Sequence, residues 1–221
     1  LAELNYIVTC IDINKEMIQA MNSLLKLKNP RETIVNENWL TNSLPDNSFD
    51  IVLGDAVLPN VAWEDRETLL LQIKRVIRPK GLYITRAFCI PRKKPFKNIN
   101  QLLDHFSNKQ PNYTSALELV FELQILTYTP NDHLGTFTKP KEILEKLRDN
   151  DDFRFKNKNL NTLLKMVWDF WCTKFINKVF TYAYRDEEEE QYQKYFEIIE
   201  IYEADDHPYS KITPMYVLKL R

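Results

Sequence analysis

Apolar and polar positions come in alternating blocks over the first 90 residues, and these blocks predict strands and helices in turn. An apolar run over residues 7–11 ends at Asp12 and predicts a buried strand. Asn14 is a good N-cap for the helix that follows. The apolar stripe of that helix consists of Met17, Ile18, Met21, Leu24 and Leu25. The first block therefore predicts a strand, an acidic residue and an amphipathic helix.

The same layout returns further along the chain. Residues 33–35 predict a short strand, and turn residues at 44–48 lead into an apolar run at 49–53, which predicts a buried parallel strand. The next helix has its apolar positions at Leu69, Leu70, Ile73, Val76 and Ile77. A turn at 78–81 should end it, and residues 82–88 predict another central strand. Strands that alternate with helices predict a parallel sheet with helices on both faces.

The rest of the chain has a different pattern. The helix candidates between residues 90 and 195 are 99–106, 115–126, 139–148, 160–184 and 187–195, and we expect no strands among them. The closing segments, 196–202 and 215–220, are rich in β-branched and aromatic residues and are joined by a turn at 205–208. They predict an antiparallel hairpin at the edge of the sheet.

Composition excludes several classes of protein. In 221 residues, 30 Lys and Arg balance 31 Asp and Glu, so no overall field favours nucleic acid or an anionic membrane. Cys10, Cys89 and Cys172 are odd in number and lack metal-ligand spacing, and the three histidines are scattered, so no metal site is expected. There is no apolar stretch of about 20 residues and no basic region followed by an apolar one at residues 1–15. We expect a soluble cytoplasmic protein.

Three segments resemble class I S-adenosylmethionine-dependent methyltransferases. Residues 8–18 resemble the second strand and following helix of this family, 44–55 the fourth strand, and 76–81 the approach to the fifth. The terminal hairpin resembles the sixth and seventh strands. The resemblance implies a Rossmann-like α/β sandwich with a mostly parallel sheet, a C-terminal antiparallel hairpin and a large helical insertion. Its parts would be 1–90 for the cofactor, 91–195 as an insertion and substrate lid, and 196–221 to complete the sheet.

The resemblance also implies a site for S-adenosylmethionine. Asp12 would accept hydrogen bonds from both ribose hydroxyls, which an ionised carboxylate can do with two oxygens. The other implied contacts are Ile13 and Met17 beside the adenosine, Asn38 and Trp39 at the adenine, and Gly54 and Asp55 at the methionine moiety. The entrance for the acceptor would consist of Ala56, Val57 and Asn60.

Each of these positions also has a purely structural explanation. Asp12 and Asp55 could cap turns, and Trp39 could be a core aromatic residue. The aromatic residues between 168 and 184 could pack the insertion or form a wall of the acceptor pocket. No catalytic residue is assigned, and Asp55, Tyr113 and His133 remain candidates for a base.

One departure from the family concerns its glycine-rich loop. That loop lies between the first strand and the first helix, and this chain has only 3 Gly and no such motif. Residues 1–4 resemble the segment that follows the loop. Since the family's first strand is central in its sheet, we expect the natural protein to be longer.

The sequence thus predicts methyl transfer from S-adenosylmethionine to an unidentified acceptor, with small molecules favoured over long nucleic acid. One alternative is a methyltransferase-like module that has lost catalysis and binds a protein partner. A second is an NAD-dependent oxidoreductase, because an acidic residue after the second strand binds ribose there too. The terminal antiparallel hairpin argues against the second.

Overall fold

The computed structural model describes residues 6–24, 26–205, 207 and 209–221. The predictions for Leu25 and for residues 1–4 lie outside this range. The helices are α1 (Lys15–Leu24), α2 (Arg66–Val76), α3 (Ile99–Ser107), α4 (Tyr113–Thr127), α5 (Thr138–Glu145), α6 (Lys158–Val167) and α7 (Arg185–Gln193). The longer strands are β1 (Val8–Ile11), β2 (Glu32–Val35), β3 (Phe49–Asp55), β4 (Ile77–Arg86), β9 (Phe196–Tyr202) and β10 (Met215–Leu220). The short strands are β5 (Leu134–Thr136), β6 (Arg148–Asp149), β7 (Asp152–Phe153) and β8 (Val179–Thr181).

The N-terminal strands form a sheet of their own. β1 and β2 pair in parallel, from Val8 opposite Glu32 to Ile11 opposite Val35. The predicted N-cap of α1 is confirmed, because Asn14 Oδ1 accepts a hydrogen bond from the Met17 backbone N–H at 2.9 Å. The predicted burial of its apolar stripe is wrong. No residue described in α1 is buried, and Met17 is 50% exposed, since no described element covers that face.

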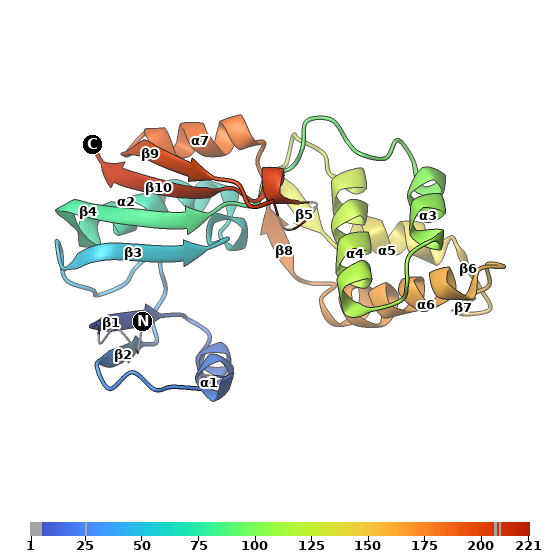
Figure 1. Cartoon of the computed structure of the whole chain (residues 1–221), viewed down its shortest axis with the longest axis horizontal. Coiled ribbons are helices and arrows are strands. Elements are labelled where there is room, and N and C mark those ends of the chain that lie inside the picture. Colours follow the sequence, from blue (N-terminus) through green and yellow to red (C-terminus); the bar gives the residue numbers. More distant parts are fainter. Residues whose placement is uncertain (1–5, 25, 206, 208) are drawn as a thin grey trace.

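The second sheet has four strands in the order β3-β4-β10-β9 (Figure 1). β3 and β4 are parallel, whereas β10 runs antiparallel to both of its neighbours. On one face, α2 and α7 help to bury a cluster that includes Leu69, Tyr83, Tyr192 and Tyr216, which we call the sheet core.

The opposite face of this sheet is open, which corrects two predictions. Ile51 and Leu53 of β3 are 52% and 59% exposed, so the strand is not the buried one that its apolar run predicted. Met215 and Ile199 are exposed as well. β3 is an edge strand among the described residues, and the expected single sheet with helices on both faces is instead two sheets.

The segment at 78–81 is not a turn but part of β4. β3 and β4 pair at Phe49 and Ile77, and then again from Ile51 opposite Leu82, so several β4 residues are extra at this point. A Cβ on Gly81 would lie 2.8 Å from the Asp50 carbonyl oxygen, so the strands approach here only because residue 81 is glycine.

The segment from α3 to β8 forms a body with its own core, which includes Leu102, Leu119, Leu163 and Trp171. The predicted helix over 160–184 is wrong, because α6 ends at Val167 and continues as a π-helix over Trp168–Cys172 before β8. The expectation of no strands is wrong too, since β5 pairs with β8 and β6 with β7. The helix expected at 187–195 is α7, and its Tyr192 belongs to the sheet core.

A buried ion pair connects the helical body to the sheet. Arg66 at the start of α2 is 1% exposed, and its Nη1 donates to Glu188 Oε2 of α7 at 2.8 Å. Its Nη2 donates to the carbonyl oxygen of Thr181 in β8 at 2.6 Å. Nearby, the ring of His133 stacks on Trp63 with centroids 3.5 Å apart. Figure 1 shows the consequence, a helical body that lies beyond the ends toward which β3 and β4 point.

Candidate functional site

Charged residues mark the carboxyl ends of three parallel strands. Asp12 follows β1, Asp55 ends β3 and Arg86 ends β4. β1 and β3 point the same way in Figure 1, toward the helical body. Ligands of open α/β sheets bind outside the carboxyl ends of the strands, so this edge is the candidate site.

The Asp12 carboxylate has a structural partner in the turn after β1. Its Oδ1 accepts from the Asn14 backbone N–H at 2.7 Å, and Asn36 Nδ2 donates to the Asp12 carbonyl oxygen at 2.8 Å. A carboxylate offers about four acceptor positions, so this bond leaves room for a ligand. Ile13 and Met17, which follow Asp12 in the sequence, are 64% and 50% exposed. The turn after β1 and the first turn of α1 thus carry one carboxylate and two exposed apolar side chains.

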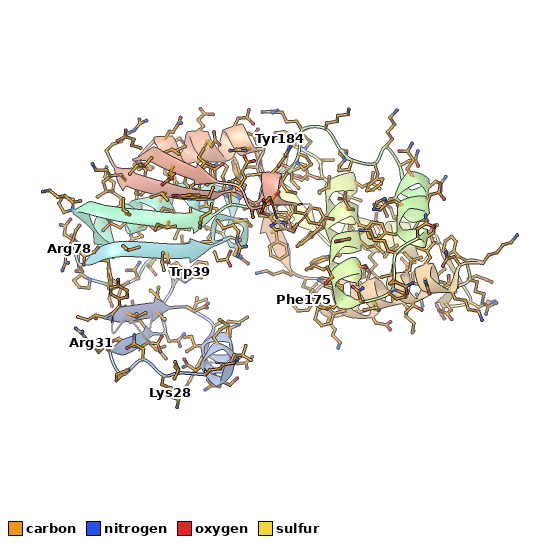
Figure 2. The ribbon with its side chains drawn as sticks, in the orientation of Figure 1. Lys28, Arg31, Trp39, Arg78, Phe175 and Tyr184 are labelled. Atoms are coloured by element: carbon orange, nitrogen blue, oxygen red, sulfur yellow. The ribbon has the colours of Figure 1, made fainter. Side chains whose placement is uncertain are left out.

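Asn38 and Trp39 hold the connection between the two sheets. Asn38 Oδ1 accepts from the Leu40 backbone N–H at 2.9 Å. The Trp39 indole N–H donates to the Ile11 carbonyl oxygen at 3.0 Å, and its ring packs against the sheet core. Figure 2 shows Trp39 between the sheets. Both residues have structural roles, and their contact with adenine stays a prediction.

Asp55 forms a two-pronged ion pair with Arg86, the residue opposite it in β4. Arg86 Nε donates to Asp55 Oδ1 at 2.8 Å, and Nη2 donates to Oδ2 at 2.7 Å. The hydrogen bond to Asp55 raises the pKa of Arg86 above its ordinary value, so the guanidinium stays charged. Arg86 is not among the predicted site residues. The strand predicted over 82–88 extends past it, and the sequence pattern does not show which residue lies opposite it.

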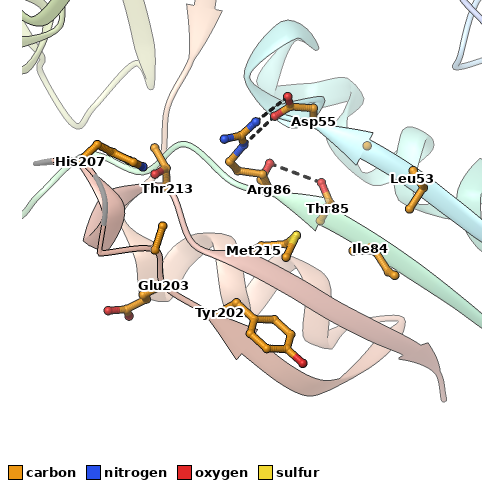
Figure 3. A pocket seen from close by; sticks show the side chains of 12 residues that line it. Leu53, Asp55, Ile84, Thr85, Arg86, Tyr202, Glu203, His207, Thr213 and Met215 are labelled. Carbon is orange, nitrogen blue, oxygen red and sulfur yellow. Dashed lines mark hydrogen bonds and ion pairs between the residues drawn. The ribbon is translucent and has the colours of Figure 1, made fainter. Parts of the chain in front are cut away.

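A cavity of about 660 Å³ opens beside this pair (Figure 3). Leu53, Ile84 and Met215 contribute apolar wall, while Tyr202 and Thr213 come from the C-terminal strands and the segment between them. Of the predicted cofactor residues only Gly54 and Asp55 line it; Asp12, Ile13, Met17, Asn38 and Trp39 lie elsewhere.

The predicted acceptor entrance is mostly engaged in local contacts. Asn60 Nδ2 donates to the Ala56 carbonyl oxygen at 2.9 Å, and Val57 packs against the sheet core. Ala56 has a φ of 49°, and its N–H donates to the Arg86 carbonyl oxygen at 2.9 Å. Of the other base candidates, Tyr113 is 63% exposed on α4 and His133 stacks on Trp63, so neither joins Asp55 at the cavity.

Neither a metal cluster nor a membrane span is found in the part of the chain that the structure describes. No group of three or more His, Cys, Asp and Glu side chains there could hold a metal ion. No helix there is long and apolar enough to cross a bilayer.

Comparison with known proteins agrees with this architecture. Residues 1–85 match the family model described as a methyltransferase domain, although no curated protein matches the chain. A SAM-dependent methyltransferase from Methanosarcina mazei has a similar structure, with a TM-score of 0.53 over 99% of this chain and 84% of the other, at 17% identity. The chain has a class I methyltransferase fold. The match over residues 1–85 and the shared fold agree with the predicted resemblance to methyltransferases.

Two further structures show how far this likeness reaches. The glycopeptide N-methyltransferase MtfA, complexed with S-adenosylhomocysteine, has a TM-score of 0.52 at 10% identity, over 99% of this chain and 76% of its own. A protein described as a putative zinc-dependent alcohol dehydrogenase from Rhodobacter sphaeroides has a TM-score of 0.51 at 15% identity, over 96% and 75%. Their names differ in chemistry, so structural likeness at this identity indicates the fold alone.

The segments whose resemblance to the family's second strand, fourth strand and terminal hairpin is described above form β1, β3 and the β9–β10 pair.

Proposed function

We propose that this protein transfers a methyl group from S-adenosylmethionine to a small-molecule acceptor. The observation that carries the proposal is the methyltransferase-domain match over residues 1–85 on a sheet in which the antiparallel β10 lies between β4 and β9. That strand order distinguishes the fold from plain dinucleotide-binding sheets. It supports methyl transfer over the NAD-dependent alternative.

The residues after β1 suit an adenosine. Asp12 has acceptor capacity beyond its bond to Asn14, and the exposed side chains of Ile13 and Met17 offer apolar surface for a base. S-adenosylmethionine supplies a methyl group bonded to a sulfonium, which an acceptor atom displaces directly. The protein then contributes binding, alignment and exclusion of water.

The acceptor side is proposed at the cavity beside Asp55 and in the helical body. The cavity volume is in the range of small-molecule sites. The helical body lies beyond the same edge, so we propose that acceptor selectivity depends on residues 91–195 and that residues 1–90 and 196–221 form the cofactor-binding sheet. The cytoplasm stays the proposed location, from the unpaired cysteines of the sequence.

We also infer that the active form has a further strand between β1 and β3. Among the described residues β1 pairs only with β2, and β3 only with β4, so each leaves one row of backbone N–H and C=O groups without a strand partner. The exposed side chains of Ile51 and Leu53 add an apolar surface beside the β3 edge. A parallel strand would satisfy both edges.

Calorimetric titration with S-adenosylmethionine, S-adenosylhomocysteine and NAD tests the proposal. It should be done with this chain and with a form that includes any residues the gene encodes upstream. We expect the two adenosyl ligands to bind, more tightly to the longer form, and NAD not to bind. Binding of NAD alone would overturn the proposal. If no upstream strand and loop are encoded and neither adenosyl ligand binds, the proposal fails.

The open sheet face favours a second candidate, a methyltransferase-like module that binds a partner. Exposed Ile51, Leu53, Ile199 and Met215 form apolar surface of the kind that mediates association. This candidate predicts that the longer form binds no adenosyl ligand. Titration of that form therefore separates the two candidates.

A further inference from the structure

A cluster of exposed aromatic residues lies where α6 leads into β8, outside the cavity. The π-helix Trp168–Cys172 and the residues after it leave Phe170 and Phe175 37% and 42% exposed, with ring centroids 5.0 Å apart. Trp171 contacts Phe170 at 4.9 Å between centroids, and Tyr113 of α4, which is 63% exposed, lies 6.0 Å from the Trp171 ring. Phe175 lies at the margin of the helical body (Figure 2). We call these four residues the aromatic patch.

The patch is exposed although its backbone is held by local hydrogen bonds. Thr173 Oγ1 donates to the Asp169 carbonyl oxygen at 2.6 Å, and the Lys178 N–H donates to the Phe175 carbonyl oxygen at 2.9 Å. Trp171 belongs to the core of the helical body, so it anchors the segment there. The fold therefore presents the two exposed rings in fixed positions. π-helices are rare and are frequent at functional sites.

Two lysines lie beside the exposed rings. Lys174 Nζ is 5.6 Å from the Phe170 ring centroid, and Lys178 closes the turn that contains Phe175. Within the part of the chain that the structure describes, neither lysine forms an ion pair. The acidic residue of the segment 168–179, Asp169, is 3.4 Å from Lys165 and is neutralised by it. The patch therefore carries positive charge that no neighbouring carboxylate balances.

The segment that includes the helical body is basic as a whole. Residues 91–181 contain 15 Lys and Arg against 10 Asp and Glu, whereas the rest of the chain contains 15 against 21. The balanced total therefore conceals a division into a basic helical body and an acidic remainder. Because charges of one sign attract the opposite sign, an anionic partner meets the helical body more favourably than the sheets.

We propose that the aromatic patch binds the surface of an anionic phospholipid membrane, with Phe170 and Phe175 among the acyl chains. Lys174 and Lys178 then lie at the anionic headgroups. Surfaces that bind a membrane without crossing it combine Phe, Trp or Leu side chains with Lys or Arg beside them. An anionic leaflet strengthens binding about fivefold for each Lys close to it. The proposal uses neither the cofactor nor the cavity, so it does not depend on methyl transfer.

The geometry of the rings favours a membrane over single-stranded nucleic acid. Nucleic acid binding needs a basic groove and ring faces on which successive bases stack. Phe170 meets Trp171 at an interplanar angle of 77° and Phe175 at 50°, so the rings pack against one another and form no common stacking plane. A cluster of this kind suits insertion among lipid chains, where burial of apolar surface is the driving force.

Co-sedimentation with vesicles tests the role of charge. The probes are vesicles of phosphatidylcholine mixed with phosphatidylserine and vesicles of phosphatidylcholine alone. We expect the chain to bind the mixed vesicles at least tenfold more tightly. Lys174→Gln with Lys178→Gln should weaken that binding about 30-fold, since each Lys contributes about fivefold. The control, Lys194→Gln with Lys219→Gln, removes two exposed lysines from the sheet region and should change binding less than twofold.

The apolar part of the patch is tested with Phe175→Ala and the matched control Leu71→Ala of α2, because these side chains are 42% and 44% exposed. Phe175→Ala should weaken binding to the mixed vesicles about tenfold, as expected when an inserted ring is lost. The control should bind like the parent. Both variants should unfold at nearly the same temperature as the parent, so circular dichroism separates lost binding from lost folding.

The outcomes separate this inference from the proposed function. Mixed vesicles that do not bind, or that bind equally well without Lys174, Lys178 or Phe175, overturn the inference. So does a form with any upstream residues that fails to bind vesicles, because another segment then covers the patch. Self-association or oligonucleotide binding that depends on Phe175, without vesicle binding, overturns it as well. Vesicle binding without binding of any adenosyl ligand supports the inference and counts against methyl transfer.

Discussion

Replacement of Arg66 by Met should destabilise the fold more than the loss of any exposed ion pair. The side chains of Arg66 and Glu188 are 2% and 1% exposed, so Arg66→Met leaves a buried carboxylate without its countercharge. It also leaves the Thr181 carbonyl oxygen without its donor. Breaking a buried pair in this way costs about 3 to 5 kcal/mol. For a chain of this size that corresponds to a melting temperature lower by about 6 to 20 °C.

The pH dependence of Arg66→Met has a defined sign. Burial raises the pKa of Glu188, and removal of Arg66 removes the positive charge that opposes this rise. An acid whose pKa is raised on folding holds its proton more tightly in the folded state, so stability falls as pH rises above the unfolded pKa of about 4.3. The deficit of the variant relative to the parent should therefore grow from pH 5 to pH 8.

Urea unfolding of four proteins measures these effects. They are the parent, Arg66→Met, Arg66→Met with Glu188→Gln, and the exposed control Arg154→Met, whose partner Asp149 is 3.2 Å away. The double variant should be more stable than Arg66→Met at pH 8, because no charge remains buried. The control should lose at most about 1 kcal/mol. A loss in Arg66→Met no larger than that of the control, or a double variant less stable than the single one, would refute the reasoning.

Three further predictions concern single residues. Asp12→Asn keeps a side-chain oxygen that accepts from the Asn14 N–H, so this variant should fold like the parent. Calorimetry should show S-adenosylhomocysteine binding weaker by about 1 to 3 kcal/mol. An unchanged affinity would remove Asp12 from the site. Burial, with Glu32 beside the thiol, raises the pKa of Cys10 to about 11. The rate of Cys10 alkylation, followed by mass spectrometry, should therefore increase up to about that pH, and Glu32→Gln should increase the rate at pH 8. A rate that levels off near pH 9 would contradict this. Gly81→Ala places a Cβ 2.8 Å from the Asp50 carbonyl oxygen and should cost about 1 to 3 kcal/mol in urea unfolding; a neutral effect would mean that the strands can separate there.

Local signals in the sequence were sufficient where an element makes its own contacts. The α2 stripe is buried as predicted, with Leu69, Leu70 and Ile73 in the sheet core, because a period of 3.6 places those positions on one face. The N-cap of α1 was readable from Asn14 for the same reason, since capping involves residues only three apart.

The predictions of side-chain burial and of element length were wrong where these properties depend on segments distant in the sequence. The apolar run at 49–53 is a strand, but whether Ile51 is covered depends on what packs on the open face. Likewise, the aromatic run after Val167 fits a helix by periodicity, yet residues 179–181 pair with β5 some 45 positions earlier. Such tertiary pairing overrides local propensity, and it cannot be predicted from the local sequence pattern.

The candidate site itself depends on the register shift between β3 and β4, in the segment 78–81 that the sequence predicts as a turn. If the pairing of Phe49 with Ile77 continued without interruption, Asp55 would lie opposite Tyr83. The extra residues around Gly81 shift the register, so that Arg86 meets Asp55 instead. A side chain at residue 81 would collide with the backbone of β3, so this glycine permits the shift. It lies five residues before Arg86, roughly 17 Å along an extended strand at about 3.3 Å per residue. Gly81, which the sequence predicts in a turn at the end of a helix, therefore determines that Arg86 lies opposite Asp55 beside the cavity.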